Sequence, residues 1–167
     1  KEIKFNYQRI LDHLRQQAYL TKGVKITVTD ERIKPSQNYS FYFEGGIVAY
    51  VQYLNRNKAK KQEVIYSCDK MVDEINVEVA FQYTDDFQCM EQSFANNIHT
   101  PEGGMHLTGF RTALTRNLND YARKNGLSLI VHSVGWSVAM KHVCAEYSVV
   151  RCQRSGGIGS SSNGTLL

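Results

Sequence analysis

The sequence predicts an α+β fold in which an antiparallel sheet packs against a long helix. Three observations lead to this prediction. Apolar side chains alternate without a break along residues 75–83, which is typical of a β-strand. Apolar stripes at helical spacing lie before and after that strand. The elements follow one another as a run of strands and then a helix, rather than as alternating strands and helices, which favours α+β over α/β.

The composition excludes several classes of protein. Hydrophobic residues make up 42% of the 167 residues and charged residues 22%, which is enough for a packed core. No run reaches the roughly 18 apolar residues of a membrane span, and no secretory signal opens the chain. Four cysteines (Cys68, Cys89, Cys144 and Cys152) form neither a CxxC pair nor a disulfide framework. We therefore expect reduced thiols in a cytoplasmic protein and, because no Met begins the chain, a segment of a longer one.

Local patterns predict the elements of the N-terminal part in order. Apolar residues at helical spacing predict a helix over 7–19, with Asn6 as its N-cap and Gly23 as the stop after it. Alternating side chains at 24–28 predict a half-buried strand. A polar connector separates that strand from a short aromatic one at 39–43.

A second helix is predicted after the glycine pair at 45–46, because four apolar residues recur at i, i+3, i+4 and i+7 from Ile47. The basic segment 56–61 then follows as the solvated end of this helix.

Three strands and a long helix are predicted in the central part. Residues 64–68 and 75–83 form strands, and 87–95 returns after a turn as a partner strand. A loop over 96–104 precedes an amphipathic helix over 107–126.

The motifs that carry chemistry in other proteins are largely missing. The glycine pairs at 45–46 and 103–104 lack the spacing of a phosphate-binding loop, so positive φ at a strand-to-helix junction is the favoured explanation. The histidines do not form the paired ligands of a zinc site, and no nucleophile motif is present. The sequence therefore predicts no catalytic residue and no metal site.

The polar side of the long helix permits two interpretations. Two arginines, Arg111 and Arg116, lie among threonine and asparagine side chains there. Such a surface suits sequence-independent contacts with nucleic-acid phosphates, and a net charge of +4 is compatible with them. A solvated helix face explains the same pattern equally well.

Four stretches carry a resemblance to a known family. They are NYQRILDHLRQQAYLTKGVKITVTDER, FYFEGGIVAYVQYLNRNK, INVEVAFQYTDDF and SFANNIHTPEGGMHLTGFRTALTRNLNDYARKNGL. Together they resemble the DNA gyrase B family of type II topoisomerases, with its topoisomerase IV counterpart as a near relative. The resemblance implies that residues 1–38 are the C-terminal remnant of a GHKL ATPase domain. It implies that residues 39–127 are a partial transducer domain of the ribosomal-protein-like class.

The resemblance also implies a function for the parent protein. Such enzymes hydrolyse ATP while a dimer of B subunits captures double-stranded DNA and passes it through a cut made by the A subunit of gyrase, which introduces negative supercoils. ATP and magnesium are cofactors of the parent, and this fragment is expected to bind neither and to be inactive, because the ATP site precedes residue 1. Two alternatives remain: the B subunit of topoisomerase IV, or a non-catalytic module of the same fold that binds nucleic acid or a protein partner.

Residue roles follow from the same resemblance. Glu44, Gly45 and Gly46 match the joint between the ATPase and transducer domains. A structural loop before the long helix is matched by Asn96, Asn97, Gly103, Gly104 and His106. Arg111 matches an arginine that lines the family's DNA-sized cavity, and Arg116 is a weaker candidate for the same surface.

The resemblance ends near Leu127, where the composition also changes. Residues 128–167 hold only four charged side chains in forty positions, and the chain ends in a low-complexity stretch. The family's QTK loop, whose lysine reaches the ATP γ-phosphate, is absent, and SLIVHSVGWSVAMKHVCAEY stands in that region. We interpret this tail as divergent and non-native, for example through a reading-frame error, with no structure expected in the last dozen residues. An uninterrupted frame confirmed through codons 128–167 excludes that origin.

Overall fold

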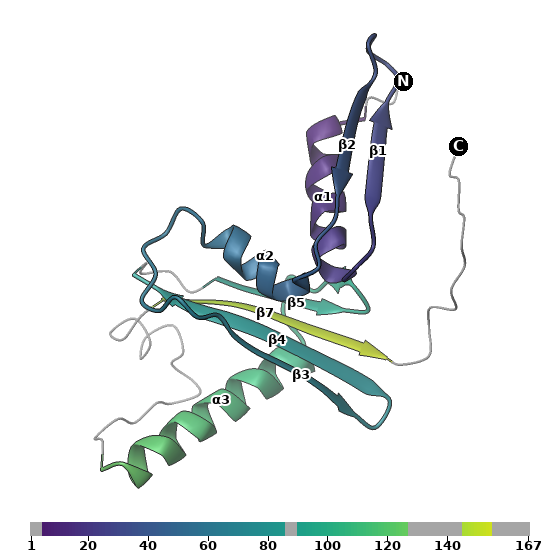
Figure 1. Ribbon diagram of the computed structural model, residues 1–167. Coiled ribbons are helices and arrows are strands. Elements are labelled where there is room, and N and C mark those ends of the chain that lie inside the picture. Colours follow the sequence, from purple (N-terminus) through teal and green to yellow (C-terminus); the bar gives the residue numbers. More distant parts are fainter. Residues whose placement is uncertain (1–4, 86–89, 127–144, 155–167) are drawn as a thin grey trace.

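The computed structural model describes residues 5–85, 90–126 and 145–154, and in these ranges the chain forms two lobes (Figure 1). The hairpin lobe consists of α1 (Tyr7–Leu20), β1 (Ile26–Asp30) and β2 (Gln37–Phe41). The sheet lobe consists of two helices and five strands. They are α2 (Gly46–Leu54), β3 (Tyr66–Val72), β4 (Ile75–Thr84), β5 (Met90–Ala95), β6 (Ile98–His99), α3 (Met105–Lys124) and β7 (Ala145–Arg154).

The hairpin lobe follows the local sequence pattern closely. The side chain of Asn6 accepts a hydrogen bond from the backbone N–H of Arg9 at 3.1 Å, so the predicted N-cap of α1 is confirmed. β1 and β2 pair antiparallel with Ile26 opposite Phe41. Leu11 and Phe41 are buried between the helix and the hairpin, and the alternating residues of β1 face them. This lobe therefore has a small core of its own.

Asp30 ends β1 as a buried carboxylate with one strong partner. Arg32 donates from Nε at 2.8 Å, from Nη2 at 2.6 Å and from its backbone N–H at 3.1 Å. The side-chain hydrogen bond of Arg32 is the main cause that lowers the pKa of Asp30 from 3.8 to about 2. Because the ionised form is favoured in the folded state, Asp30 contributes stability above its ordinary pKa and loses it as the pH falls toward 2.

Replacing Asp30 by asparagine is expected to make the free energy of unfolding depend less steeply on pH in acid. The variant should be less stable than the parent chain at neutral pH, and the difference should shrink as the pH falls from about 4 to about 2. Urea unfolding at a series of pH values measures this. A difference in unfolding free energy that stays constant over that interval contradicts the assignment.

The sheet has the strand order β3-β4-β7-β5-β6 and is mixed. β7 pairs antiparallel with β4 along its whole length, from Ala145 opposite Thr84 to Arg154 opposite Ile75, and it pairs parallel with β5. The predicted pairing of 87–95 with 75–83 is therefore wrong, because β7 lies between the two. Successive residues Val149 and Val150 are 0% and 1% exposed, which is typical of a central strand covered on both faces.

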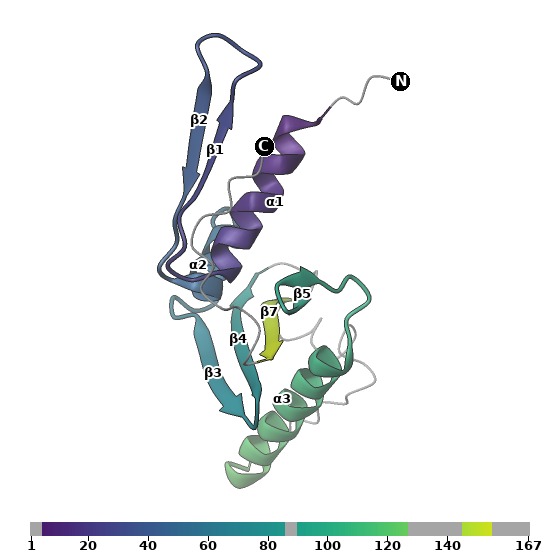
Figure 2. The ribbon, with the colours of Figure 1, turned by 90° about the vertical axis from the view of Figure 1, so that its right-hand side faces the viewer.

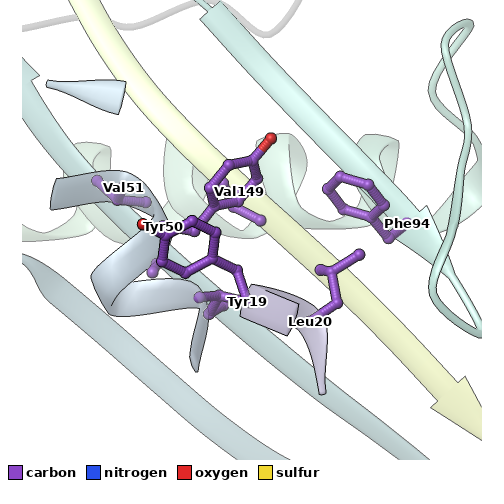
Figure 3. Packing of buried hydrophobic residues seen from close by; sticks show 8 residues of the cluster. Tyr19, Leu20, Tyr50, Val51, Phe94 and Val149 are labelled. Carbon is purple, nitrogen blue, oxygen red and sulfur yellow. The ribbon is translucent and has the colours of Figure 1, made fainter. Parts of the chain in front are cut away.

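Each face of the sheet has its own layer of helices. α2 and the C-terminal end of α1 lie over one face, and α3 lies over the other (Figure 1 and Figure 2). Val149 faces the first layer together with Ala80 and Phe94 (Figure 3). Val150 faces α3, where Val79 and Leu107 complete the cluster. The α+β class predicted from the sequence is confirmed, with β7 as the element that both cores share.

Two details of the helices differ from the prediction. α2 ends at Leu54, and the basic segment 56–61 is a loop rather than the end of the helix. The cause is the buried Asn55, whose side-chain amide donates to the side-chain oxygen of Gln82 at 2.9 Å and turns the chain toward β4. In α3 the apolar stripe is only partly covered, and Tyr121 is 64% exposed.

Candidate functional site

The predicted joint at Glu44, Gly45 and Gly46 lies where the chain passes from β2 of the hairpin lobe to α2 of the sheet lobe (Figure 1). Gly46 has φ +55°, the conformation that favours glycine, as the sequence predicts. Gly45 needs to be small for another reason, since a Cβ there would lie 2.9 Å from the Cβ of Ala49. The Glu44 carboxylate accepts a hydrogen bond from the hydroxyl of Tyr42 at 3.0 Å and stays on the surface.

A buried ion pair lies beside this joint. Nη2 of Arg151 on β7 is 2.6 Å from Oε2 of Glu78 on β4, and the two side chains are only 12% and 9% exposed. Nη1 of Arg151 donates to the carbonyl of Leu20 at 2.5 Å. That carbonyl is one of the last four of α1, which have no partner within the helix. The guanidinium therefore joins the end of α1 in the hairpin lobe to two strands of the sheet.

The turn between β5 and β6 completes the junction. Asn96 and Asn97 both have positive φ, as a tight two-residue hairpin turn requires, and asparagine tolerates that conformation. The carbonyl of Asn97 accepts from the Gln17 side chain at 3.1 Å, and its side-chain oxygen lies 3.5 Å from Nη1 of Arg151. We call the residues that meet here the interlobe cluster; they are Gln17, Leu20, Glu78, Asn97 and Arg151.

Sequence reasoning misses most of the interlobe cluster. It identifies Asn97 as part of a loop, but Arg151, Glu78 and Gln17 belong to no motif. The available signal is weak: Glu78 lies at a polar position of the most regular alternation in the chain, and Arg151 follows two adjacent valines. A charge at a central strand position needs a partner, because an isolated buried charge is costly.

A second set of contacts joins α1 to α2. The hydroxyl of Tyr50 accepts from the side-chain amide of Gln16 at 3.1 Å and donates to Gln92 at 2.8 Å. Burial raises the pKa of Tyr50, so its hydroxyl stays protonated and able to donate. The ring of Tyr19 stacks on Phe43 with centroids 3.7 Å apart. The two lobes are thus held together by packing as well as by the hydrogen bond from Arg151 to the Leu20 carbonyl.

The loop before α3 serves to start that helix. Gly103 has φ +79°, as predicted for a glycine at such a junction, and its N–H donates to Thr100 at 2.9 Å. Gly104 is the N-cap of α3, and a Cβ at this position would lie 2.9 Å from the ring of His106. In the structure these residues lie in and just after the connection from β6 to α3.

The two candidate DNA-contacting arginines are not brought together. Arg111 donates from Nε to Oε1 of Glu91 on β5 at 3.0 Å, and its Nη2 pairs with the other carboxylate oxygen. Arg116 is exposed. Five helical residues correspond to about 140° around the axis, so the two side chains leave α3 on different sides. Arg111 is thus fixed against the sheet, and Arg116 is separate from it.

Membrane-spanning helices and metal sites are both absent from the described residues. No helix within residues 5–85, 90–126 and 145–154 is long and apolar enough to cross a membrane. In the same ranges, no group of three or more histidine, cysteine, aspartate or glutamate side chains is arranged to hold a metal ion.

Comparison with known proteins gives consistent matches. The family model described as DNA gyrase B matches residues 46–148. The B subunit of DNA gyrase from Streptococcus pneumoniae is 46% identical over 123 residues, 74% of this chain and 19% of that protein. The corresponding protein of Clostridium acetobutylicum is 47% identical over 127 residues, 75% of this chain and 20% of that protein. The chain therefore spans about a fifth of the length of these relatives.

Solved structures agree with the sequence matches. The 43K ATPase domain of Thermus thermophilus gyrase B, in complex with an aminocoumarin, superposes with a TM-score of 0.74 at 28% identity and covers 93% of this chain and 41% of that one. The ATP-binding domain of Francisella tularensis topoisomerase IV, in complex with a small-molecule inhibitor, has a TM-score of 0.72 at 17% identity. It covers 98% of this chain and 42% of its own, and at that identity it shows the fold alone.

Proposed function

Because the chain belongs to the DNA gyrase B family, we propose that it is the coupling segment of an ATP-dependent type II DNA topoisomerase. In this proposal the parent enzyme uses ATP binding and hydrolysis to drive DNA strand passage and negative supercoiling. We propose gyrase rather than topoisomerase IV because the curated relatives with 46–47% identity are gyrase B proteins. Residues 1–38 then belong to the ATPase domain, residues 39–127 to the transducer domain, and residues 128–167 to a divergent tail. Within that tail, β7 (Ala145–Arg154) pairs with β4 and β5 and completes the sheet of the transducer.

The observation that carries this proposal is the contact of Arg151 with the end of α1. A coupling segment must transmit a rotation of one lobe to the other rather than absorb it. The guanidinium of Arg151 holds the Leu20 carbonyl at 2.5 Å and the Glu78 carboxylate at 2.6 Å, and its side chain is only 12% exposed. A displacement of the hairpin lobe therefore moves β4 and β7 with it, and these strands carry α3 on their far face.

The proposal assigns partners and cofactors to the parent enzyme. ATP and magnesium act in the ATPase domain outside this chain. A second B subunit, the A subunit of gyrase and double-stranded DNA are the partners, and the enzyme works in the cytoplasm. The glycines at the joint permit the small backbone change between the ATP-bound and free states, and the interlobe cluster limits how far the lobes separate.

Replacing Arg111 by glutamine in the parent enzyme is expected to reduce DNA-stimulated ATP hydrolysis and strand passage several-fold, while basal nucleotide binding stays unchanged. The reason is the loss of a cation that we place against a DNA phosphate. The slope of the logarithm of the DNA-binding constant against the logarithm of the salt concentration should therefore also fall in magnitude by about one. ATP hydrolysis with and without DNA, at two salt concentrations, measures both effects.

Glu91→Gln is the matched control, because it weakens the same ion pair but keeps the arginine charge. If both variants lose the same amount of DNA-stimulated ATP hydrolysis, the role of Arg111 is to hold α3 in place through its ion pair with Glu91. Full stimulation in Arg111→Gln removes Arg111 from the proposed DNA surface.

A further inference from the structure

A pocket of about 380 Å³ lies between α1 and α2, along the line where the two lobes meet. Its volume is within the range of small-ligand sites in proteins. The lining side chains come from both lobes: Arg9, Asp12, His13, Arg15, Gln16, Tyr50, Tyr53 and Leu54. Apart from Leu54, each of these side chains carries a polar group. The pocket therefore offers a ligand several polar contacts.

The charge of the lining is positive and only partly compensated. Asp12 is its one acid, and that carboxylate already accepts from Arg15 at 3.2 Å and from the Gln8 side chain at 3.0 Å. Within the described part of the chain, the side chains of Arg9 and His13 form no hydrogen bond or ion pair. Two donors thus face the pocket without an internal acceptor.

Two guanidinium groups, those of Arg15 and Arg56, lie against the ring of Tyr53, which lines the pocket. The guanidinium carbons of Arg15 and Arg56 lie 5.6 and 4.1 Å from the centroid of the Tyr53 ring. Arg15 also donates to the hydroxyl of Tyr53 at 2.9 Å and lies over Phe41, so its position is fixed by several contacts. Two like charges on one ring repel each other, and a bound anion relieves that repulsion.

We propose that this pocket binds a phosphate group. Guanidinium groups present paired N–H donors that match phosphate oxygens, and a fixed arginine loses little entropy on binding. The group belongs either to a free polyphosphate or to the backbone of a nucleic acid, since the chemistry is shared. Because Arg9 and Arg15 come from α1 while Tyr53 comes from α2, a bound phosphate also bridges the two lobes.

Calorimetric titration of the full chain with inorganic pyrophosphate, at constant ionic strength, tests this site. Arg9→Gln is the informative variant, because the side chain it removes has no partner in the described structure and the fold should persist, as circular dichroism verifies. Arg123→Gln is the matched control, since it removes one charge from an exposed position on α3. We expect Arg9→Gln to weaken binding about tenfold and Arg123→Gln to leave it unchanged.

A parallel titration with a short DNA duplex distinguishes the two sources. Saturable pyrophosphate binding that depends on Arg9 identifies free polyphosphate. Duplex binding weakened by Arg9→Gln much more than by Arg123→Gln, without pyrophosphate binding, identifies a nucleic-acid phosphate. Equal effects of the two variants, or no saturable binding of either probe, overturn the proposal. The assay needs no ATP hydrolysis, so its outcome is independent of the function proposed above.

Discussion

Replacing Arg151 by methionine is expected to lower the free energy of unfolding by about 3–5 kcal/mol, because it leaves a buried carboxylate without its counter-charge. Glu78 is only 9% exposed, and its Oε2 lies 2.6 Å from the guanidinium that the variant removes. The Leu20 carbonyl loses its donor in the same step. Urea unfolding followed by circular dichroism measures the change.

The double variant Arg151→Met/Glu78→Leu separates the ion pair from general damage to β7. With both charges removed, no unpaired carboxylate remains, so the double variant should be more stable than Arg151→Met alone. Arg123→Gln, which disrupts an exposed pair with Asp120, should cost less than about 1 kcal/mol. If the effects of the single variants Arg151→Met and Glu78→Leu simply add in the double variant, the two side chains are not coupled and the assigned ion pair is wrong.

Local signals explain which elements the sequence predicts well. The predicted bounds of α1 and β4 lie within one residue of the observed ones, since their periodicity and the Asn6 cap are encoded in consecutive positions. β7 is not predicted. Its partners β4 and β5 lie some fifty residues or more before it, and no local pattern reports pairing over that distance. The charge at Arg151 further weakens the alternation in a segment that lies in the centre of the sheet.

The residues of the candidate site likewise fall into those that the sequence predicts and those that it does not. Some backbone requirements are visible in the sequence, so residue type identifies Gly46 and Gly103 as glycines at strand-to-helix junctions. Asn96 and Asn97 are placed in a loop by the resemblance, and the fold shows that they form the turn between β5 and β6. Side-chain partnerships are not visible, because they join positions far apart. Arg111 illustrates this: its resemblance to a DNA-facing arginine is visible in the sequence, but its ion pair with Glu91 across twenty positions emerges only from the fold.

Coupling between the lobes depends on both polar and apolar contacts. The hydrogen bond from Arg151 to the Leu20 carbonyl fixes the position of the end of α1 against the sheet, and the ion pair with Glu78 holds the guanidinium in place. The apolar cluster beneath it supplies most of the stabilisation, because burial of apolar area is the larger favourable contribution. Leu20 takes part in both, through its carbonyl and through its side chain. Weakening the apolar cluster should therefore loosen the contact between the lobes even when the hydrogen bond from Arg151 to Leu20 is intact.

Replacing Phe94 by alanine is expected to lower the free energy of unfolding by about 3–5 kcal/mol, through lost burial and the cavity left behind. Phe94 is fully buried on β5, where it packs with Leu20 of α1 and Val149 of β7 (Figure 3). The ring also lies 5.3 Å from the ring of His99. Urea unfolding measures the loss, and limited proteolysis reports whether the lobes separate before the sheet unfolds.

Tyr121→Ala provides the matched control, because it removes an aromatic ring of similar size from a position that is 64% exposed. It should change the free energy of unfolding by less than about 0.5 kcal/mol. Phe94→Leu, which retains apolar volume, should recover more than half of the loss, since the residual cavity is smaller. If Phe94→Ala costs no more than Tyr121→Ala, the cluster around Leu20 does not hold the lobes together, and rigid transmission through this junction fails as a mechanism.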